Sequence, residues 1–221
     1  MASSKRRTFA QRAMEADPIV RIYESRLWRR SLVVRGVLGL SFARESALIL
    51  EAMQLDATRD VLDLACGSGI YTRPLAHALP SGRVVGLDRS RPMLRHALRR
   101  VGAERLRNAS FVRGDALRLP FSDARFDVVN CCGALHLFPD AACAVAEVHR
   151  VLRRGGRFTV AVVRRDEGLL APLAGVLARL GVESFTSATL TTLLGGAGFE
   201  SVQIHHARAL WVIASATKPR V

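Results

Sequence analysis

The spacing of hydrophobic positions changes near residue 56 of the chain. Between residues 44 and 55, apolar side chains recur at a mostly helical spacing. Beyond that point the chain holds short apolar runs rich in valine and leucine, which are typical of strands covered on both faces of a sheet. The runs are VLDLA (61–65), VVGLD (84–88), ASFVRGD (109–115), FDVVNC (126–131) and GRFTVAVV (156–163).

The segments between these runs predict amphipathic helices. One helix should begin with Ser90 as its N-cap and Pro92 in its first turn, followed by apolar residues at helical spacing. A second should cover roughly residues 139–153 and end at Gly155-Gly156. Strands that alternate with helices predict right-handed crossovers and a parallel sheet.

The last part of the chain has a different pattern. The strand-like runs FESVQIHH and ALWVIASAT are separated only by about Ala207-Arg208, which is hairpin spacing. The expected fold class is therefore α/β, a doubly wound and mostly parallel sheet with a C-terminal antiparallel hairpin. We divide the chain into a basic N-terminal segment, residues 1–43, and one domain over residues 44–221.

The charge of the chain changes this picture little. A formal net charge of +14 would ordinarily indicate an anionic partner, but the only lysines are Lys5 and Lys218. An arginine bias of this kind also arises from a GC-rich genome, so we expect a small-molecule partner rather than nucleic acid. Weak contact with a membrane surface stays open, and part of the excess charge lies in the first 35 residues.

Targeting and metal signals are weak. The opening MASSKRRTFAQRAM has the composition of a short basic start or of an organelle transit peptide. No apolar run approaches the ~18 residues that a membrane span needs. The cysteines, Cys66, Cys131, Cys132 and Cys143, match no zinc spacing, so no metal site is expected. Adjacent Cys131 and Cys132 cannot readily pair with each other, which favours a reduced cytoplasmic setting.

The turn after the first run, Ala65-Cys66-Gly67-Ser68-Gly69, is the first candidate for a ligand site. In open α/β sheets ligands bind beyond the carboxyl ends of the strands, and glycines allow the backbone to approach them closely. A dinucleotide turn would place a third small residue where Thr72 stands. A pyrophosphate ligand is therefore disfavoured.

Three acids at strand ends indicate which ligand the turn holds. The Asp88 carboxylate can accept both hydrogen bonds from a ribose diol. Asp115 can accept a hydrogen bond from an adenine amino group while the Ala116 N–H meets a ring nitrogen, and Asp63 can help to hold an ammonium group directly or through water. Diol, adenine and amino-acid head group together describe S-adenosylmethionine, which has no phosphates.

With these features the sequence resembles the class I S-adenosylmethionine-dependent methyltransferases, and among these the ubiquinone/menaquinone C-methyltransferase group. The resemblance runs from about Ala43 to Pro219 and also includes a poorly characterised branch of plant and bacterial methyltransferases. The family's first glycine is Ala65 here. The resemblance implies a seven-stranded Rossmann-like sheet. It rests on VLDLACGSG, VVGLDRSRPML, RGDALRLPFSDARFDVV, ALHLFPD, EVHRVLRRGGRF and LLGGAGFESV.

The resemblance also implies which residues meet the cofactor. The methionine moiety would lie against Gly67 and Gly69, and the ribose on Asp88. The adenine would lie between Arg89, Met93 and the segment Asp115-Ala116-Leu117, and Asn130 or Cys131 would offer a backbone carbonyl to the amino group. The cofactor set is Asp63, Ala65, Cys66, Gly67, Gly69, Asp88, Arg89, Met93, Asp115, Ala116, Leu117, Asn130 and Cys131. Asp127 is expected to be structural.

The acceptor side has less specific candidates. His136 follows the fourth strand and has a reference pKa suited to a general base, although it could equally be a hydrogen-bonded loop residue that shapes the pocket. The N-terminal segment of such proteins commonly covers the site, and here it offers Tyr23, Trp28 and Arg29. The apolar stretch 167–181 could line the acceptor pocket.

We therefore expect a methyltransferase acting on carbon or oxygen of a small lipophilic or aromatic metabolite. The alternatives are an RNA or protein methyltransferase that uses the basic N-terminus and a non-catalytic S-adenosylmethionine-binding module. The continuation NCCGAL of the fourth strand lacks the D/N-P-P-[FYW] signature of amino-group methylation. Thiol-dependent methylation of a metalloid, suggested by Cys131 and Cys132, is a further alternative that their spacing does not otherwise support.

Overall fold

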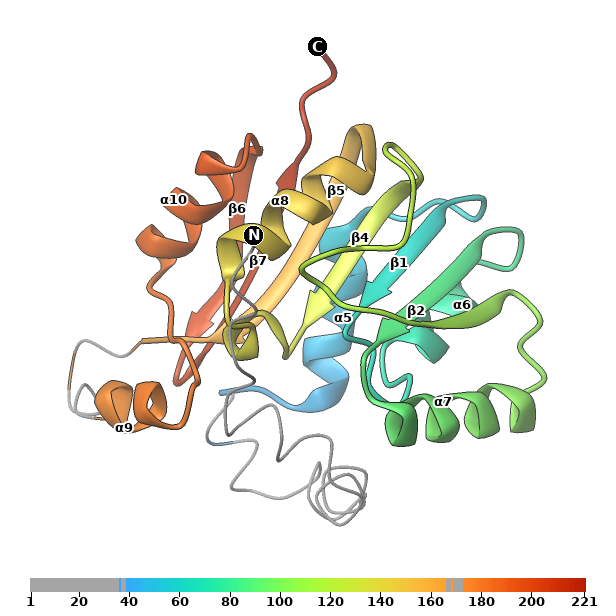
Figure 1. Cartoon of the computed structure of the whole chain (residues 1–221), viewed down its shortest axis with the longest axis horizontal. Coiled ribbons are helices and arrows are strands. Elements are labelled where there is room, and N and C mark those ends of the chain that lie inside the picture. Colours follow the sequence, from blue (N-terminus) through green and yellow to red (C-terminus); the bar gives the residue numbers. More distant parts are fainter. Residues whose placement is uncertain (1–35, 37–38, 166–167, 169–172) are drawn as a thin grey trace, which may run out of the picture.

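A seven-stranded sheet forms the centre of the protein, shown in Figure 1 as a computed structural model. The structure describes residues 36, 39–165, 168 and 173–221. The strand order is β3-β2-β1-β4-β5-β7-β6. The strands are β1 (Asp60–Leu64), β2 (Arg83–Asp88), β3 (Ala109–Arg113), β4 (Phe126–Cys132), β5 (Leu152–Val163), β6 (Glu200–Arg208) and β7 (Trp211–Thr217).

The sheet is doubly wound, as the sequence predicts. Strands β3, β2, β1, β4 and β5 are parallel, while β7 pairs antiparallel with both β5 and β6. From β1 the chain moves outward to β2 and β3, and from β4 it moves to β5 on the other side. The order therefore reverses between β1 and β4, where α/β proteins of this kind bind ligands.

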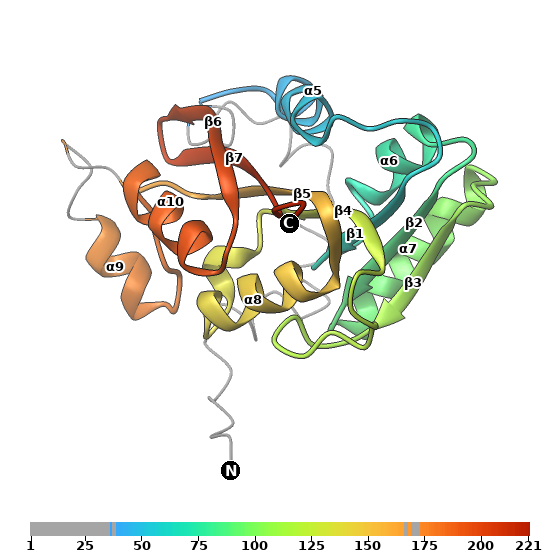
Figure 2. The same cartoon turned by 90° about the horizontal axis from the view of Figure 1, so that it is seen from above.

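Helices cover both faces of the sheet (Figure 2). On one face, α5 (Phe42–Met53) and α6 (Thr72–Ala78) contribute Ile49, Met53 and Leu75 to a buried apolar cluster. On the other, α8 (Ala141–Val151) and α10 (Ser187–Gly196) pack on a second cluster that includes Phe158. The remaining helices are α7 (Arg91–Ala103), the 3-10 helix η1 (Leu135–Leu137) and α9 (Leu173–Arg179).

Helix α7 begins as its sequence predicts. The Ser90 hydroxyl accepts the Met93 N–H at 3.4 Å, and Pro92 lies in the first turn, where its missing N–H costs nothing. Met93, Leu94, Ala97 and Val101 are buried against the sheet. Leu98 also fits the apolar spacing but is 57% exposed.

Two predicted boundaries were wrong. Gly155-Gly156 do not end α8, because that helix stops at Val151 and β5 starts at the buried Leu152. The glycines lie within β5, where the register with β4 shifts and Gly155 adopts φ +73. The turn of the terminal hairpin falls at Ala209-Leu210, two residues later than expected, and Ala209 has positive φ.

The structure also bears on the predicted domain division, on the cysteines, and on metal and membrane signals. The division at residue 43 falls in the first turn of α5, whose N-cap is Ser41, while residues 1–35 lie outside the described residues. The four cysteines form no disulfide bond in the part of the chain that the structure describes. No cluster of three metal-binding side chains occurs among the described residues, and no helix there is long and apolar enough to cross a membrane.

Candidate functional site

An open cavity of about 960 Å³, including the space at its mouth, lies at the carboxyl ends of β1, β2 and β4. This is the place where the strand order reverses. Its lining residues are Ala65, Cys66, Gly67, Ile70, Tyr71, Leu87, Asp88, Arg89, Ser90, Met93, Gly114, Asp115, Ala116, Leu117, Cys132, Gly133, Ala134, Leu137, Phe138 and Pro139.

The glycine turn forms one wall of this cavity. Ala65, Gly67 and Gly69 have φ between 53 and 77, so the chain reverses tightly between β1 and α6. Gly67 lines the cavity. Gly69 does not, and a Cβ there would meet the Cβ of Ala97 at 3.3 Å. Gly69 therefore allows close packing of the turn on α7, whereas Gly67 leaves space for a ligand.

The Asp88 carboxylate holds the turn in place. One of its oxygens accepts the Gly67 N–H at 2.9 Å, and the other accepts the Ser90 N–H at 2.8 Å. A carboxylate has about four acceptor positions, so these bonds leave capacity for a ligand hydroxyl. Asp88 is half-buried and lines the cavity. The same side chain thus shapes the turn and presents negative charge to the pocket.

The segment after β3 closes the polar end of the cavity. Asp115 is exposed, and its carboxylate accepts the Leu117 N–H at 3.0 Å. The Gly114 N–H donates to the Asp88 carbonyl at 3.1 Å, which ties this loop to the end of β2. Ala116 is buried beside it, and Arg89 and Met93 line the same cavity.

A chain of buried side chains lies behind the glycine turn. The Asp63 carboxylate accepts the Thr72 hydroxyl at 2.5 Å and the Asn130 amide at 2.8 Å. The Cys132 thiol donates to the Asn130 side-chain oxygen at 2.9 Å. Burial raises the pKa of Asp63 to about 6, although both hydrogen bonds oppose the shift. Asp63 does not line the cavity, so any role toward a ligand passes through this chain or through water.

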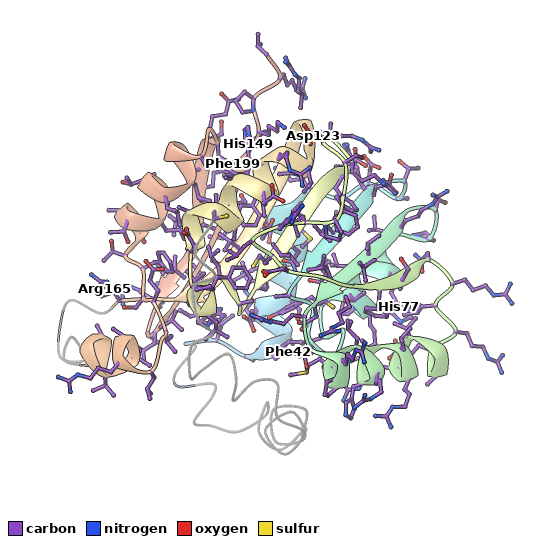
Figure 3. All side chains as sticks on the ribbon, in the orientation of Figure 1. Phe42, His77, Asp123, His149, Arg165 and Phe199 are labelled. Carbon is purple, nitrogen blue, oxygen red and sulfur yellow. The ribbon has the colours of Figure 1, made fainter. Side chains whose placement is uncertain are left out.

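The opposite end of the cavity is mostly apolar. Its wall comes from the start of α6 and from the loop after β4, with Tyr71 and Phe138 as its aromatic members. The centroid of the Tyr71 ring lies 5.8 Å from that of Phe42, which Figure 3 labels, and the two rings are tilted by 45°. Burial raises the pKa of the lining thiols Cys66 and Cys132, which keeps both protonated.

His136 does not line the cavity, although its neighbour Leu137 does. Its Nδ1 accepts the Val163 N–H at 3.4 Å, and its ring packs edge-on against Trp211 with centroids 5.9 Å apart. Burial lowers the pKa of His136 to about 4, so the ring is neutral at physiological pH. In this arrangement its contacts are those of a residue that shapes the loop.

The remaining predicted residues lie elsewhere. Asn130 and Cys131 are fully buried in β4 and do not line the cavity. Tyr23, Trp28 and Arg29 lie outside the described residues. Residues 167–181 are described only in part, and their helix α9 does not contribute to the cavity lining.

The part of the lining that follows β4 was not predicted from the sequence. Cys132, Gly133 and Ala134 at the end of β4 contribute, as do Leu137, Phe138 and Pro139. Their signal was available, because a loop after the strand next to β1 must open at the same edge of the sheet. Only its histidine was selected as a candidate.

Comparison with known proteins agrees with this geometry. Residues 61–156 match the family described as "Methyltransferase domain". Demethylmenaquinone methyltransferase of Lactiplantibacillus plantarum is 38% identical over 124 residues, covering 55% of this chain and 52% of that protein. An uncharacterized chloroplastic methyltransferase of Arabidopsis thaliana is 34% identical over 147 residues, covering 64% of this chain and 41% of that protein. The chain thus spans about half the length of these relatives.

A solved structure shares the fold at lower identity. The [4+2]-cyclase SpnF superposes with a TM-score of 0.70 at 21% identity, covering 80% of each chain. The glycine turn, the acid at the end of β2 and the loop after β3 all fall within the matched residues 61–156. Residues 61–156 therefore match a methyltransferase domain, and the chain resembles the class I S-adenosylmethionine-dependent methyltransferases of the menaquinone C-methyltransferase group.

Proposed function

We propose that this protein binds S-adenosylmethionine in the cavity and transfers its methyl group to carbon or oxygen of a small lipophilic or aromatic acceptor. The observation that carries the proposal is that different strands supply polar and apolar groups to one cavity. Asp88 and Asp115 come from the ends of β2 and β3, and Tyr71, Leu137 and Phe138 come from the segments after β1 and β4. A polar nucleoside with an adjacent apolar acceptor matches this arrangement.

The residues of the polar end fit this cofactor. Gly67 has φ +54 and lines the cavity, so a ligand can approach its backbone where a Cβ would otherwise intrude. Asp88 and Asp115 supply acceptors for hydroxyl and amino groups. Two carboxylates beside the single cation Arg89 would repel a pyrophosphate, which disfavours a dinucleotide at this end of the described lining.

The bound cofactor would supply a methyl group on a sulfonium, which is already activated for transfer to a nucleophile. The protein then has to orient the acceptor and exclude water, and proximity alone contributes on the order of 7–11 kcal/mol in favourable systems. Asp88 would fix the ribose and the glycine turn together. The apolar wall around Phe138 would hold the acceptor and keep water out.

The predicted residues keep specific roles in this proposal. Ala65, Cys66, Gly67, Asp88, Arg89, Met93, Asp115, Ala116 and Leu117 would contact the cofactor directly, since all line the cavity. Gly69, Asp63, Asn130 and Cys131 would support them from behind. His136 would act as a positioning residue for the loop after β4. Residues 1–43 would cover the acceptor end with Tyr23, Trp28 and Arg29, and the protein would work in the cytoplasm.

The acceptor class follows from the apolar wall and from the relatives named demethylmenaquinone methyltransferases. We propose a reduced, flat, lipophilic ring as acceptor. Methylation of RNA or of a protein would need an acceptor end with polar groups for a nucleobase or a peptide, and the described wall is largely apolar.

Calorimetric titration with S-adenosylmethionine tests the cofactor assignment. Asp88→Asn should weaken binding at least about 100-fold, because it removes charge-assisted hydrogen bonds to the ligand and loosens the turn. Asp123→Asn, which alters an exposed carboxyl at the opposite end of the sheet, should bind as the wild type does. Equal affinity in wild type and Asp88→Asn would refute the assignment.

A labelled-methyl assay then tests the acceptor. Reduced prenylated naphthoquinones should be methylated, and Phe138→Ala should raise KM for them while leaving cofactor affinity unchanged. Cofactor binding without turnover on any ring acceptor would instead indicate a non-catalytic module. Turnover on RNA in the same assay would overturn the acceptor proposal.

A further inference from the structure

Helix α7 presents a stripe of like charge to solvent. Arg91, Arg95 and Arg99 are four residues apart, so they lie on one face, and all three are exposed. Like charges at this spacing repel each other, and Arg91 also lies at the positive end of the helix dipole. The helix contains no acidic residue from Arg91 to Ala103. The stripe therefore destabilises the free helix and is suited to an anionic partner.

No acid neutralises this stripe among the described residues. The acids that flank the helix in sequence are Asp88 and Glu104: Asp88 accepts the Gly67 and Ser90 N–H groups, and Glu104, at the C-cap, pairs with Arg73 and with His77 at 3.0 Å. Figure 3 labels His77 on the same side of the molecule as α7. Arg99 contacts the Arg95 carbonyl and the His96 ring, and neither contact supplies a negative charge.

An exposed leucine lies beside the stripe. Leu98 is 57% exposed and lies seven residues after Arg91 and three after Arg95, so it borders the stripe on the outer face of the helix. A nucleic-acid backbone gains little from a large exposed aliphatic side chain beside its phosphate contacts. A bilayer surface does, because the side chain can enter the headgroup region while arginines contact lipid phosphates.

The position of α7 connects this face with the cavity. Ser90 and Met93, at the start of the helix, line the cavity wall. In Figure 1, α7 lies at the edge of the molecule toward which β1, β2 and β4 point, and α9 lies along the same edge. Helix α9 carries the exposed Val176 and, just after its last turn, the exposed Leu180.

We propose that the α7 face of Arg91, Arg95, Leu98 and Arg99 docks on an anionic phospholipid bilayer. Docking would bring the mouth of the cavity close to the membrane surface. A lipophilic acceptor could then reach the apolar end of the cavity without crossing water. This last consequence rests on the proposed function, whereas the docking surface rests on the charges and exposure of α7 alone.

Vesicle flotation with the full chain tests the surface directly. The probes are phosphatidylcholine vesicles with and without about one-third phosphatidylglycerol. Wild type should bind only the anionic vesicles. Replacing Arg91, Arg95 and Arg99 with Gln should weaken binding about 100-fold, since each arginine near such a surface contributes roughly a five-fold factor. Glutamine keeps helix propensity, so the fold should persist, and circular dichroism checks this.

Two further variants separate docking from net charge. Replacing Arg83, Arg107 and Arg154 with Gln removes the same charge at the amino ends of the strands, where all three are exposed. This control should lose less than five-fold in affinity. Leu98→Gln should weaken binding several-fold with no change of charge. Cofactor affinity, measured by calorimetry, should stay unchanged in every variant.

Three results would overturn the proposal. The first is equal loss of vesicle binding in the α7 and control variants, which would leave only net charge. The second is undiminished binding in the α7 variant. The third is a Leu98→Gln variant that binds vesicles normally while the α7 arginine variant loses affinity for a single-stranded RNA, which would identify a nucleic-acid surface. Failure of S-adenosylmethionine to bind the wild type would refute the proposed function and leave the docking result standing.

Discussion

Asp63→Asn should stabilise the ligand-free protein at neutral pH. Asp63 is 1% exposed, and burial raises its pKa from the ordinary value of 3.8 to about 6. Between these two pH values the folded protein keeps a proton that the unfolded chain has released, so stability is full below pH 3.8 and is lost as pH rises through 6. The corresponding cost above pH 6 is roughly 3 kcal/mol.

The asparagine can keep both contacts, with the direction of the Thr72 hydrogen bond reversed. Its amide oxygen can accept from the Asn130 side chain, and its NH₂ group can donate to the Thr72 hydroxyl. The variant therefore resembles the protonated acid at every pH. Its advantage in unfolding free energy over wild type should be near zero at pH 4 and approach roughly 3 kcal/mol at pH 7.5.

Urea unfolding followed by circular dichroism between pH 4 and 8 measures this difference. Asp123→Asn, an exposed carboxyl paired with Arg150, should show a flat difference within about 1 kcal/mol. If Asp63→Asn gains the same stability at pH 4 as at pH 7.5, burial of charge is not the cause. A variant less stable than wild type at pH 7.5 would refute the reasoning.

Three further outcomes follow from the same structure. His136→Gln should remove a loss of stability that wild type is expected to show in acid. The pKa of His136 is about 4 in the folded protein and 6.5 in the unfolded chain, so the free energy of unfolding falls as pH drops from 6.5 towards 4. Urea titrations at pH 4.5 and 7.5 measure this free energy. Gly86→Ala places a Cβ 2.6 Å from the Phe111 ring and should lower unfolding free energy by about 1–3 kcal/mol, whereas Gly86→Ala combined with Phe111→Leu should recover part of the loss. Trp211→Phe removes the buried 2.8 Å hydrogen bond to the Glu45 carboxylate and should cost about 1.5–3 kcal/mol in denaturant unfolding; an unchanged midpoint would contradict the assigned contact.

The fold was predictable where short-range pattern and topology agree. The apolar runs became strands because both faces of the sheet are covered, and Ser90 capped α7 because its hydroxyl reaches the Met93 N–H. The helix end predicted at Gly155-Gly156 was wrong because contacts with residues distant in sequence determine the structure there. The Gly155 N–H donates to the Lys218 carbonyl at 3.0 Å, and Gly156 lies so close to Asp127 that a Cβ would meet its carbonyl at 2.9 Å. Neither contact leaves a mark in the local sequence.

The site residues, too, were predictable only in part. Residues such as Gly67 and Asp88 were found because they follow strands that the pattern identifies. The direction in which a side chain points was not predictable. His136 turns toward Trp211 while the adjacent Leu137 faces the cavity, a choice made by packing in the loop after β4. The coupling of Asp63 to Cys132 through Asn130 likewise appears only when β1 and β4 are paired.

The position of β7 determines when the sheet can be completed during synthesis. This strand lies between β5 and β6 and hydrogen-bonds to both, although it follows both along the chain. While a ribosome is still adding residues before Trp211, β5 has an open edge and β6 has no partner in the sheet. The final strand must insert between them once residues 211–217 have left the exit tunnel. A nascent chain stalled before that point would expose the unpaired backbone edges of β5 and β6, which makes it a natural client for chaperones.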